Sequence, residues 1–223
     1  MPHFDIVKSS EIEKTFRVAK ILGDFDLKTE HANEHFVGDI DLPDKWNIGV
    51  IVGGSGTGKS TIAKELFGDN IENFVYNHKS VIDDMPKTEI DAIEKTFYSV
   101  GFGSVPSWLK PYSVLSNGEK MRVDLARAIL EKDFIVFDEF TSVVDRQVAQ
   151  TACIALNKAI KNSNKKFIAI SCHYDILEWL QPDWIFDTGE MKFSFMTAHV
   201  LKKNSPLENV GVTNGLNLGN ITI

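Results

Sequence analysis

Short apolar runs alternate along the chain with segments of helical character. The runs at 50–52, 134–137 and 166–171 have the length and apolar composition of buried strands. Further short strands or extended pieces are expected at Phe186 and at 191–196. Helices are predicted between these strands, at 62–67, 88–100, 120–131, 146–160 and in a segment that ends at Leu180.

The beginning of the chain carries a weaker, alternating pattern. Residues 16–27 alternate in part and predict a strand that leads into a turn, whereas the polar stretch 28–34 predicts a loop. Residues 36–42 alternate cleanly between apolar and polar side chains, which is typical of a half-exposed strand. We expect these early strands to pair as an antiparallel unit beside the main sheet.

A glycine-rich loop joins the strand at 50–52 to the helix at 62–67. From Gly53 to Ser60 it has the pattern G-x-x-x-x-G-K-S, the phosphate-binding P-loop in its strand–loop–helix context. Glycines let the backbone wrap an anion, and N–H groups at a helix N-terminus attract phosphate. Lys59 is expected to reach the β- and γ-phosphates of ATP, and the Ser60 hydroxyl to ligate Mg²⁺. The residues predicted to bind the nucleotide here are Gly53, Gly54, Ser55, Gly56, Thr57, Gly58, Lys59, Ser60 and Thr61.

Two carboxylates follow the apolar strand at 134–137. In open parallel sheets the carboxyl ends of the strands lie beside the ligand, so Asp138 and Glu139 are expected near the nucleotide. Asp138 would hold Mg²⁺ through water, and Glu139 would act as the general base on the attacking water. By itself, an Asp-Glu pair is also compatible with an acidic strand end.

Composition indicates a soluble globular protein. The 223 residues suffice for one domain, assigned here to 1–204, and the Asn- and Gly-rich residues 205–223 predict a loosely packed tail. A net charge of −7 argues against a broadly basic nucleic-acid-binding surface, though not against a local patch. No apolar run reaches the length of a membrane span, and the N-terminus has no signal-peptide pattern. Cys153 and Cys172 are predicted to be core thiols, which fits a reducing, cytoplasmic location.

The peptide L-S-N-G-E (115–119), followed by R-V-D-L-A-R-A-I, resembles the signature of the ATP-binding cassette (ABC) ATPases. Asn117 and Glu119 replace the glycine and glutamine of the family's LSGGQ. Ser116 is a natural helix N-cap, and Glu119 stands at capping-box spacing. The resemblance implies that Ser116, Asn117 and Gly118 contact the γ-phosphate held by the P-loop of a second copy, in an ATP-dependent homodimer.

Two further motifs are collinear with the family. S-V-V-D, ending at Asp145, resembles the D-loop, and His173 resembles the H-loop histidine that positions the water or the γ-phosphate. The match covers about residues 15–188. It implies an α/β fold of the P-loop NTPase, ABC type: a mostly parallel central sheet flanked by helices, with an N-terminal antiparallel β subdomain.

The chain also departs from the family pattern. No glutamine occurs from residue 60 to 146, where the family carries its Q-loop glutamine. Asp83 or Asp84 could replace it and ligate Mg²⁺ directly, or could be surface charge. The short distance from Ser60 to Leu115 predicts a shortened helical subdomain.

The aromatic residue that stacks on adenine in the family is expected in the first strand region. Phe25 is the first candidate and Phe36 the second, although either could be a core residue. Several peptides, among them D-E-F-T-S-V-V-D-R, look like a soluble ABC branch associated with GNAT-type acetyltransferase domains.

The resemblance implies an ATPase that couples ATP-driven dimerisation to an unidentified partner protein, such as an acetyltransferase or nucleic-acid-modifying enzyme. One alternative is an ATP-switched binding module with little turnover, but the presence of Glu139 favours hydrolysis. Another is the ATPase subunit of a membrane transporter, against which the short helical region and the changed Q-loop count.

Overall fold

The computed structural model describes residues 3–9, 15–26, 33–68 and 73–196, so the tail predicted at 205–223 lies outside the described residues. Helices and strands alternate through most of this range, as expected. In chain order the elements are β1 (His3–Ser9), α1 (Phe16–Asp24), β2 (Asn33–Asp39), β3 (Ile48–Val52), α2 (Lys59–Phe67), α3 (Ile90–Ser99), α4 (Val105–Trp108), the 3₁₀ helix η2 (Tyr112–Val114), α5 (Asn117–Glu131), β4 (Phe134–Phe137), α6 (Arg146–Lys161), β5 (Lys166–Ser171), α7 (Ile176–Leu180), β6 (Trp184–Asp187) and β7 (Lys192–Phe195).

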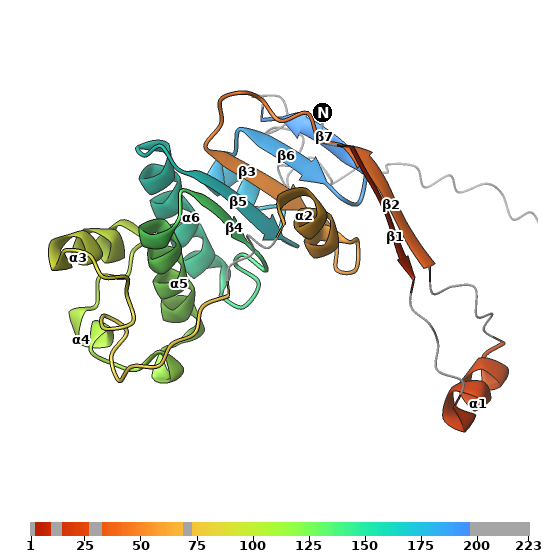
Figure 1. Ribbon diagram of the computed structural model, residues 1–223, viewed down its shortest axis with the longest axis horizontal. Helices are drawn as coiled ribbons and strands as arrows, with labels where there is room; N and C mark the ends of the chain where they lie inside the picture. Colours follow the sequence, from red (N-terminus) through yellow and green to blue (C-terminus); the bar gives the residue numbers. More distant parts are fainter. Residues whose placement is uncertain (1–2, 10–14, 27–32, 69–72, 197–223) are drawn as a thin grey trace, which may run out of the picture.

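The central sheet has the strand order β4-β5-β3-β6-β7 (Figure 1). β4, β5, β3 and β6 are parallel, and β7 pairs antiparallel with β6 at the edge. The prediction of a mostly parallel sheet is therefore confirmed. The runs at 50–52 and 166–171 form the inner strands β3 and β5, whose side chains are buried on both faces, and the run at 134–137 forms the edge strand β4.

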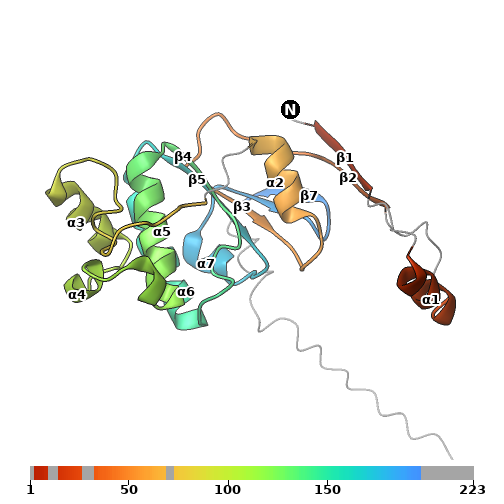
Figure 2. The ribbon, with the colours of Figure 1, turned by 60° about the horizontal axis from the view of Figure 1, so that its bottom comes forward.

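Successive side chains of the strands pack alternately into two hydrophobic cores, one on each face of the sheet. Val50 and Val52 of β3 pack in one core with residues of α3, α5, α6 and α7. Ile51, between them, packs in the other core with α2 and with Phe4 of β1. Figures 1 and 2 show the same division, with α5 and α6 on one side of the sheet and α2 and the β1–β2 sheet on the other. The P-loop helix and the small β1–β2 sheet thus share one face.

The early antiparallel unit exists, but its first strand was placed wrongly. Residues 16–24 form α1, and β2 pairs instead with β1 at 3–9. Val18, Ile21 and Leu22 are spaced for a helix, and the Thr15 side chain caps it by accepting a hydrogen bond from the Val18 N–H at 3.3 Å. An i,i+4 ion pair between Lys20 and Asp24 (2.7 Å) adds local support for the helix.

The segment between α2 and α5 is short and only partly regular. Its described part before α3, residues 73–89, contains no helix or strand, so α3 begins at Ile90, two residues after the predicted helix start at 88. The connector at 105–112, which contains Pro106 and Pro111, includes the one-turn helix α4. Trp108 is buried there and donates its indole N–H to the Phe102 carbonyl at 2.8 Å. None of the helices in the described ranges has the length and apolar composition needed to cross a membrane.

Candidate active site

Three neighbouring strands of the sheet end at the same edge, and each leads into one of the predicted motifs. β3 leads into the P-loop, β4 into Asp138 and Glu139, and β5 into the segment that contains His173. A cavity of about 470 Å³ opens at this edge. Its lining residues are Lys8, Ser55, Gly56, Gly58, Lys59, Ser60, Thr61, Asp138, Glu139, Ser142, Ile170, Ser171 and Cys172.

The P-loop backbone has a conformation that its glycines permit. Gly58, directly before α2, has φ +82°, and a Cβ atom there would lie 2.6 Å from the ring of Phe36. The Lys59 ammonium donates hydrogen bonds to the carbonyl oxygens of Gly53 (3.0 Å) and Gly54 (2.6 Å). The lysine is therefore held over the loop, at the positive end of α2, where an anion would be attracted.

Thr188, directly after β6, contacts this loop and holds it in place. This role was not predicted from the sequence. The Thr188 hydroxyl lies 2.6 Å from the Thr57 hydroxyl and donates to the Val52 carbonyl at 3.2 Å. A Cβ on Gly53 would lie 2.2 Å from the Thr188 Oγ1 atom, so the loop and the threonine fit only with glycine there. Thr57 thus contacts Thr188 and is not among the residues that line the cavity. No local pattern marks a threonine so far along the chain as a support for the P-loop.

The turn after β4 holds both predicted carboxylates toward the cavity. Phe140 is fully buried and its N–H donates to the Ile170 carbonyl at 2.8 Å, which fixes the turn to β5. Glu139 and Thr141, on either side of it, have positive φ angles of +50° and +66°. Such left-handed backbone costs energy outside glycine and is typical of functional turns. It leaves Asp138 and Glu139 at the surface of the cavity.

His173 stands two residues beyond β5 and is half-buried. Its N–H donates to the Ser171 hydroxyl at 3.1 Å, a local turn that starts the path to α7. Ser171 and Cys172 line the cavity, whereas the side chain of His173 is not part of its lining. Cys172 is an exposed free thiol and Cys153 a buried one, so the core position predicted for Cys172 is wrong.

The signature loop forms the predicted capping box. The Ser116 hydroxyl accepts from the Glu119 N–H (3.3 Å), and the Glu119 carboxylate accepts from the Ser116 N–H (2.9 Å). The Ser107 hydroxyl donates to the other carboxylate oxygen of Glu119 at 2.7 Å. Hydrogen bonds from Ser107 and Ser116 lower the pKa of Glu119.

The signature loop does not reach the P-loop of its own chain. Ser116, Asn117 and Gly118 are absent from the lining of the 470 Å³ cavity, although Asn117 and Glu139 both line a smaller cavity of about 190 Å³. Asp145, the D-loop candidate, is also outside the larger cavity and caps α6 by accepting from the N–H groups of Gln147 (3.0 Å) and Val148 (2.9 Å).

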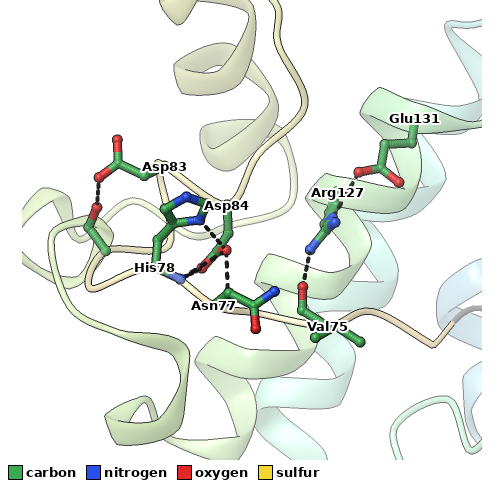
Figure 3. A network of polar contacts seen from close by, with 8 residues as sticks. Val75, Asn77, His78, Asp83, Asp84, Arg127 and Glu131 are labelled. Atoms are coloured by element: carbon green, nitrogen blue, oxygen red, sulfur yellow. Dashed lines mark hydrogen bonds and ion pairs between the residues drawn. The ribbon is translucent and has the colours of Figure 1, made fainter.

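The structure does not bring Asp83 or Asp84 to the cavity. The buried Asp84 side chain accepts from the N–H groups of Asn77 (3.0 Å) and His78 (3.2 Å), and its carboxylate lies 2.7 Å from the His78 ring (Figure 3). Burial opposes ionisation of Asp84, but hydrogen bonds from Asn77 and His78 outweigh it and lower its pKa. Asp83 accepts from the Ser80 hydroxyl. Both carboxylates thus stabilise their own loop.

Phe36, and not Phe25, lies at the P-loop. Phe25 is 69% exposed and directly follows α1, which in both ribbon views lies beyond the end of the β1–β2 sheet and away from the loop between β3 and α2. The ring of Phe36, on β2, covers Gly58. The docking of the β1–β2 sheet therefore brings the second candidate, and not the first, to the P-loop.

The donors around the cavity suit a magnesium ion that shares its coordination with phosphate. Within the described ranges, no group of three or more His, Cys, Asp and Glu side chains could hold a metal. Ser60 and Asp138 do line the same cavity, and both supply oxygen. Mg²⁺ commonly takes one or two protein oxygens and completes its shell with water and substrate phosphates.

This arrangement of sheet, loop and strand ends is that of a P-loop nucleotide-binding fold. The dimeric structure of the ATP-binding cassette MJ0796 bound to ADP and phosphate superposes with a TM-score of 0.57 and 14% sequence identity, over 74% of this chain and 93% of that chain. The fold is therefore that of an ABC ATPase domain.

Sequence similarity points to the same class. No family model matches the chain. It is 28% identical over 162 residues to the human mitochondrial iron-sulfur clusters transporter ABCB7, covering 53% of this chain and 22% of ABCB7, so it spans about a fifth of that relative. A Listeria monocytogenes protein named as an ABC transporter ATP-binding protein is 25% identical over 241 residues, covering 83% of this chain and 88% of its own length.

Proposed function

We propose that this protein is an ABC-type ATPase that binds ATP with Mg²⁺ and hydrolyses it to ADP and phosphate. The observation that supports this proposal most directly is that the P-loop residues Lys59 and Ser60 and the carboxylates Asp138 and Glu139 line the same cavity. A glycine-rich turn without function would not need an acidic strand end at the same cavity.

Each group has a role that its chemistry supports. Lys59 and the N–H groups at the start of α2 bind the phosphates. Ser60 and Asp138 would hold Mg²⁺, which offsets phosphate charge when bound. Glu139 accepts a proton from the water that attacks the γ-phosphate, and His173, one strand away, would position that water or the phosphate.

The nucleotide would be enclosed between two copies of the chain. Ser116 to Gly118 stand apart from the P-loop cavity of their own chain, yet they open the 15-residue helix α5, whose N-terminus is suited to an anion. The related cassette MJ0796 is dimeric in its ADP- and phosphate-bound structure. We therefore assign Ser116, Asn117, Gly118 and Asp145 to the site of the opposite copy.

The adenine ring would stack on an aromatic side chain of the β1–β2 sheet. Phe36 covers Gly58 at the P-loop, whereas Phe25 is exposed at the end of α1. We infer that Phe36 makes this contact.

The work done by hydrolysis depends on a partner protein. The peptides that resemble the acetyltransferase-associated branch favour a cytoplasmic acetyltransferase or nucleic-acid-modifying enzyme. The two transporter-named relatives favour a second candidate, the ATPase subunit of a membrane transporter. Purification of the Glu139→Gln protein with ATP, followed by identification of bound proteins, separates them: a membrane protein with its own spans supports the second.

The central test of the chemistry is Glu139→Gln. The amide keeps the shape of the side chain but cannot accept the proton, so we expect ATP affinity to be retained and turnover to fall roughly 10²-fold or more. Phosphate release and calorimetric titration measure the two quantities. Hydrolysis at the wild-type rate would show that another group is the base.

A further inference from the structure

One face of β1 is turned toward the body of the protein. Phe4 is 2% exposed and packs in the core shared with α2, and Ile6 packs against the same core. Asp5 and Val7, between them, are exposed. Because side chains alternate along a strand, Lys8 lies on the same face as Phe4 and Ile6.

The same sheet is placed against the P-loop through its second strand. Ile6 stands opposite Phe36 in the β1–β2 register, and the Phe36 ring covers Gly58. Lys8 comes next along this face of β1. It lines the 470 Å³ cavity together with Ser55 and Gly56 of the loop.

The charges at the cavity leave a need for a second cation. Two carboxylates, Asp138 and Glu139, and two ammonium groups, Lys8 and Lys59, belong to its lining. A nucleoside triphosphate adds several negative charges, which the carboxylates repel and which Lys59 would offset together with a bound Mg²⁺. Lys8 approaches from the β1–β2 sheet, an element separate from α2, so its charge is additional to that of Lys59.

We propose that Lys8 is a second phosphate-binding cation, which contacts the polyphosphate chain of the bound nucleotide from the β1–β2 sheet. This inference rests on the proposed function and adds a residue to that site. The sheet would then recognise both ends of ATP, with Phe36 at the base and Lys8 at the phosphates.

The test compares Lys8→Ala with Lys87→Ala, which removes the same charge from an exposed lysine outside the cavity. Affinity for ATP with Mg²⁺ is measured by fluorescent-nucleotide displacement at low and at high salt. We expect Lys8→Ala to weaken binding roughly three- to tenfold at low salt and less at high salt, because salt screens an exposed charge. Lys8→Arg keeps the charge and should bind within roughly twofold of wild type, as should Lys87→Ala.

Several results would overturn the inference. Wild-type affinity in Lys8→Ala, or an equal loss in Lys87→Ala, would show that Lys8 makes no phosphate contact. Lys59→Ala serves as the reference: if it loses ATP while Lys8→Ala does not, the proposed function stands and only the Lys8 contact falls. A wild-type protein that binds no ATP refutes both. The thermal unfolding temperature of Lys8→Ala should match that of wild type because the side chain is exposed. If it does not, the affinity measurement is made on Lys8→Gln in place of Lys8→Ala.

Discussion

At the residue scale, Glu119 stands where the family that the signature peptide resembles carries glutamine. The contacts of Glu119 use both oxygens of its carboxylate. The Ser107 hydroxyl donates to one oxygen at 2.7 Å, and the N–H and hydroxyl of Ser116 donate to the other, each at 2.9 Å. A glutamine offers one accepting oxygen and an NH₂ group that only donates. The substitution thus fits the serine at 107, which faces Glu119 from α4.

We therefore expect Glu119→Gln to destabilise the fold by about 1 kcal/mol at neutral pH, since one set of donors loses its acceptor. The lowered pKa of Glu119 means that the carboxylate stabilises the fold at pH values above its unfolded pKa, about 4.3. This stabilisation is lost as the pH falls through the lower folded pKa. Urea unfolding at pH 7 and pH 3 should show a difference between wild type and variant that shrinks at pH 3.

Ser107→Ala provides the control for this pair. Because Ser107 and Glu119 share a hydrogen bond, the double variant should lose less stability than the sum of the two single variants. Full additivity, or equal stability of Glu119→Gln and wild type at pH 7, would contradict the role given to this carboxylate.

At the scale of elements, a partly buried cluster joins the segment 73–84 and η2 to α5. The rings of Tyr76 and Tyr112 stack at 3.9 Å, and their hydroxyls donate to Asp124 of α5 at 2.6 and 2.7 Å. Arg127, one turn further, donates to the Val75 carbonyl at 3.0 Å (Figure 3). Burial raises the pKa of Asp124 and of both tyrosines. The helix that begins at the signature loop is thus fastened to the segment that follows α2.

Asp124→Ala should cost roughly 3 kcal/mol, because it leaves two tyrosine hydroxyls without their acceptor in a mostly buried site. Tyr112→Phe removes one donor and should cost about 1 kcal/mol. Tyr98→Phe is the matched control, since Tyr98 is 56% exposed, and it should leave the free energy of unfolding unchanged. If Tyr112→Phe and Tyr98→Phe unfold at the same urea concentration, the cluster does not hold α5.

The elements that sequence could predict are those whose burial dominates their pattern. β4 and β5 match the predicted runs at both ends. Both strands are covered on both faces, so their sequences are continuous apolar runs and do not alternate between apolar and polar residues. The strand predicted over α1 failed because a partly alternating stretch with few buried positions fits either period. β1 was missed for a related reason: only one of its faces is covered.

The candidate site likewise has a part that the sequence could predict and a part that it could not. Proximity of the P-loop to Asp138 and Glu139 followed from the ends of parallel strands, which sequence order and strand type determine. The contributions of Thr188, Phe36 and Lys8 depend on how β6 and the β1–β2 sheet dock, and no local pattern encodes that docking. The predicted roles of Asp83 and Asp84 ignored the loop's own N–H groups, which engage Asp84.

At the scale of the whole molecule, the proposed site is split between two copies. Lys59 and Glu139 line a cavity that the signature loop of the same chain does not reach. ATP that contacts both copies binds the closed dimer best and therefore stabilises it by mass action. With hydrolysis blocked by Glu139→Gln, the ATP-bound dimer should accumulate.

Light scattering of Glu139→Gln and of the double variant Glu139→Gln/Ser116→Arg, each with ATP and Mg²⁺, tests this claim most directly. Ser116→Arg removes the N-cap, which costs only about 1 kcal/mol, so the protein should still fold. It also puts a large side chain where the partner's γ-phosphate would lie. We expect Glu139→Gln to shift to twice the monomer mass with ATP and the double variant to remain a monomer. If both dimerise equally with ATP, the signature loop does not act across an interface, and the two-copy site is wrong.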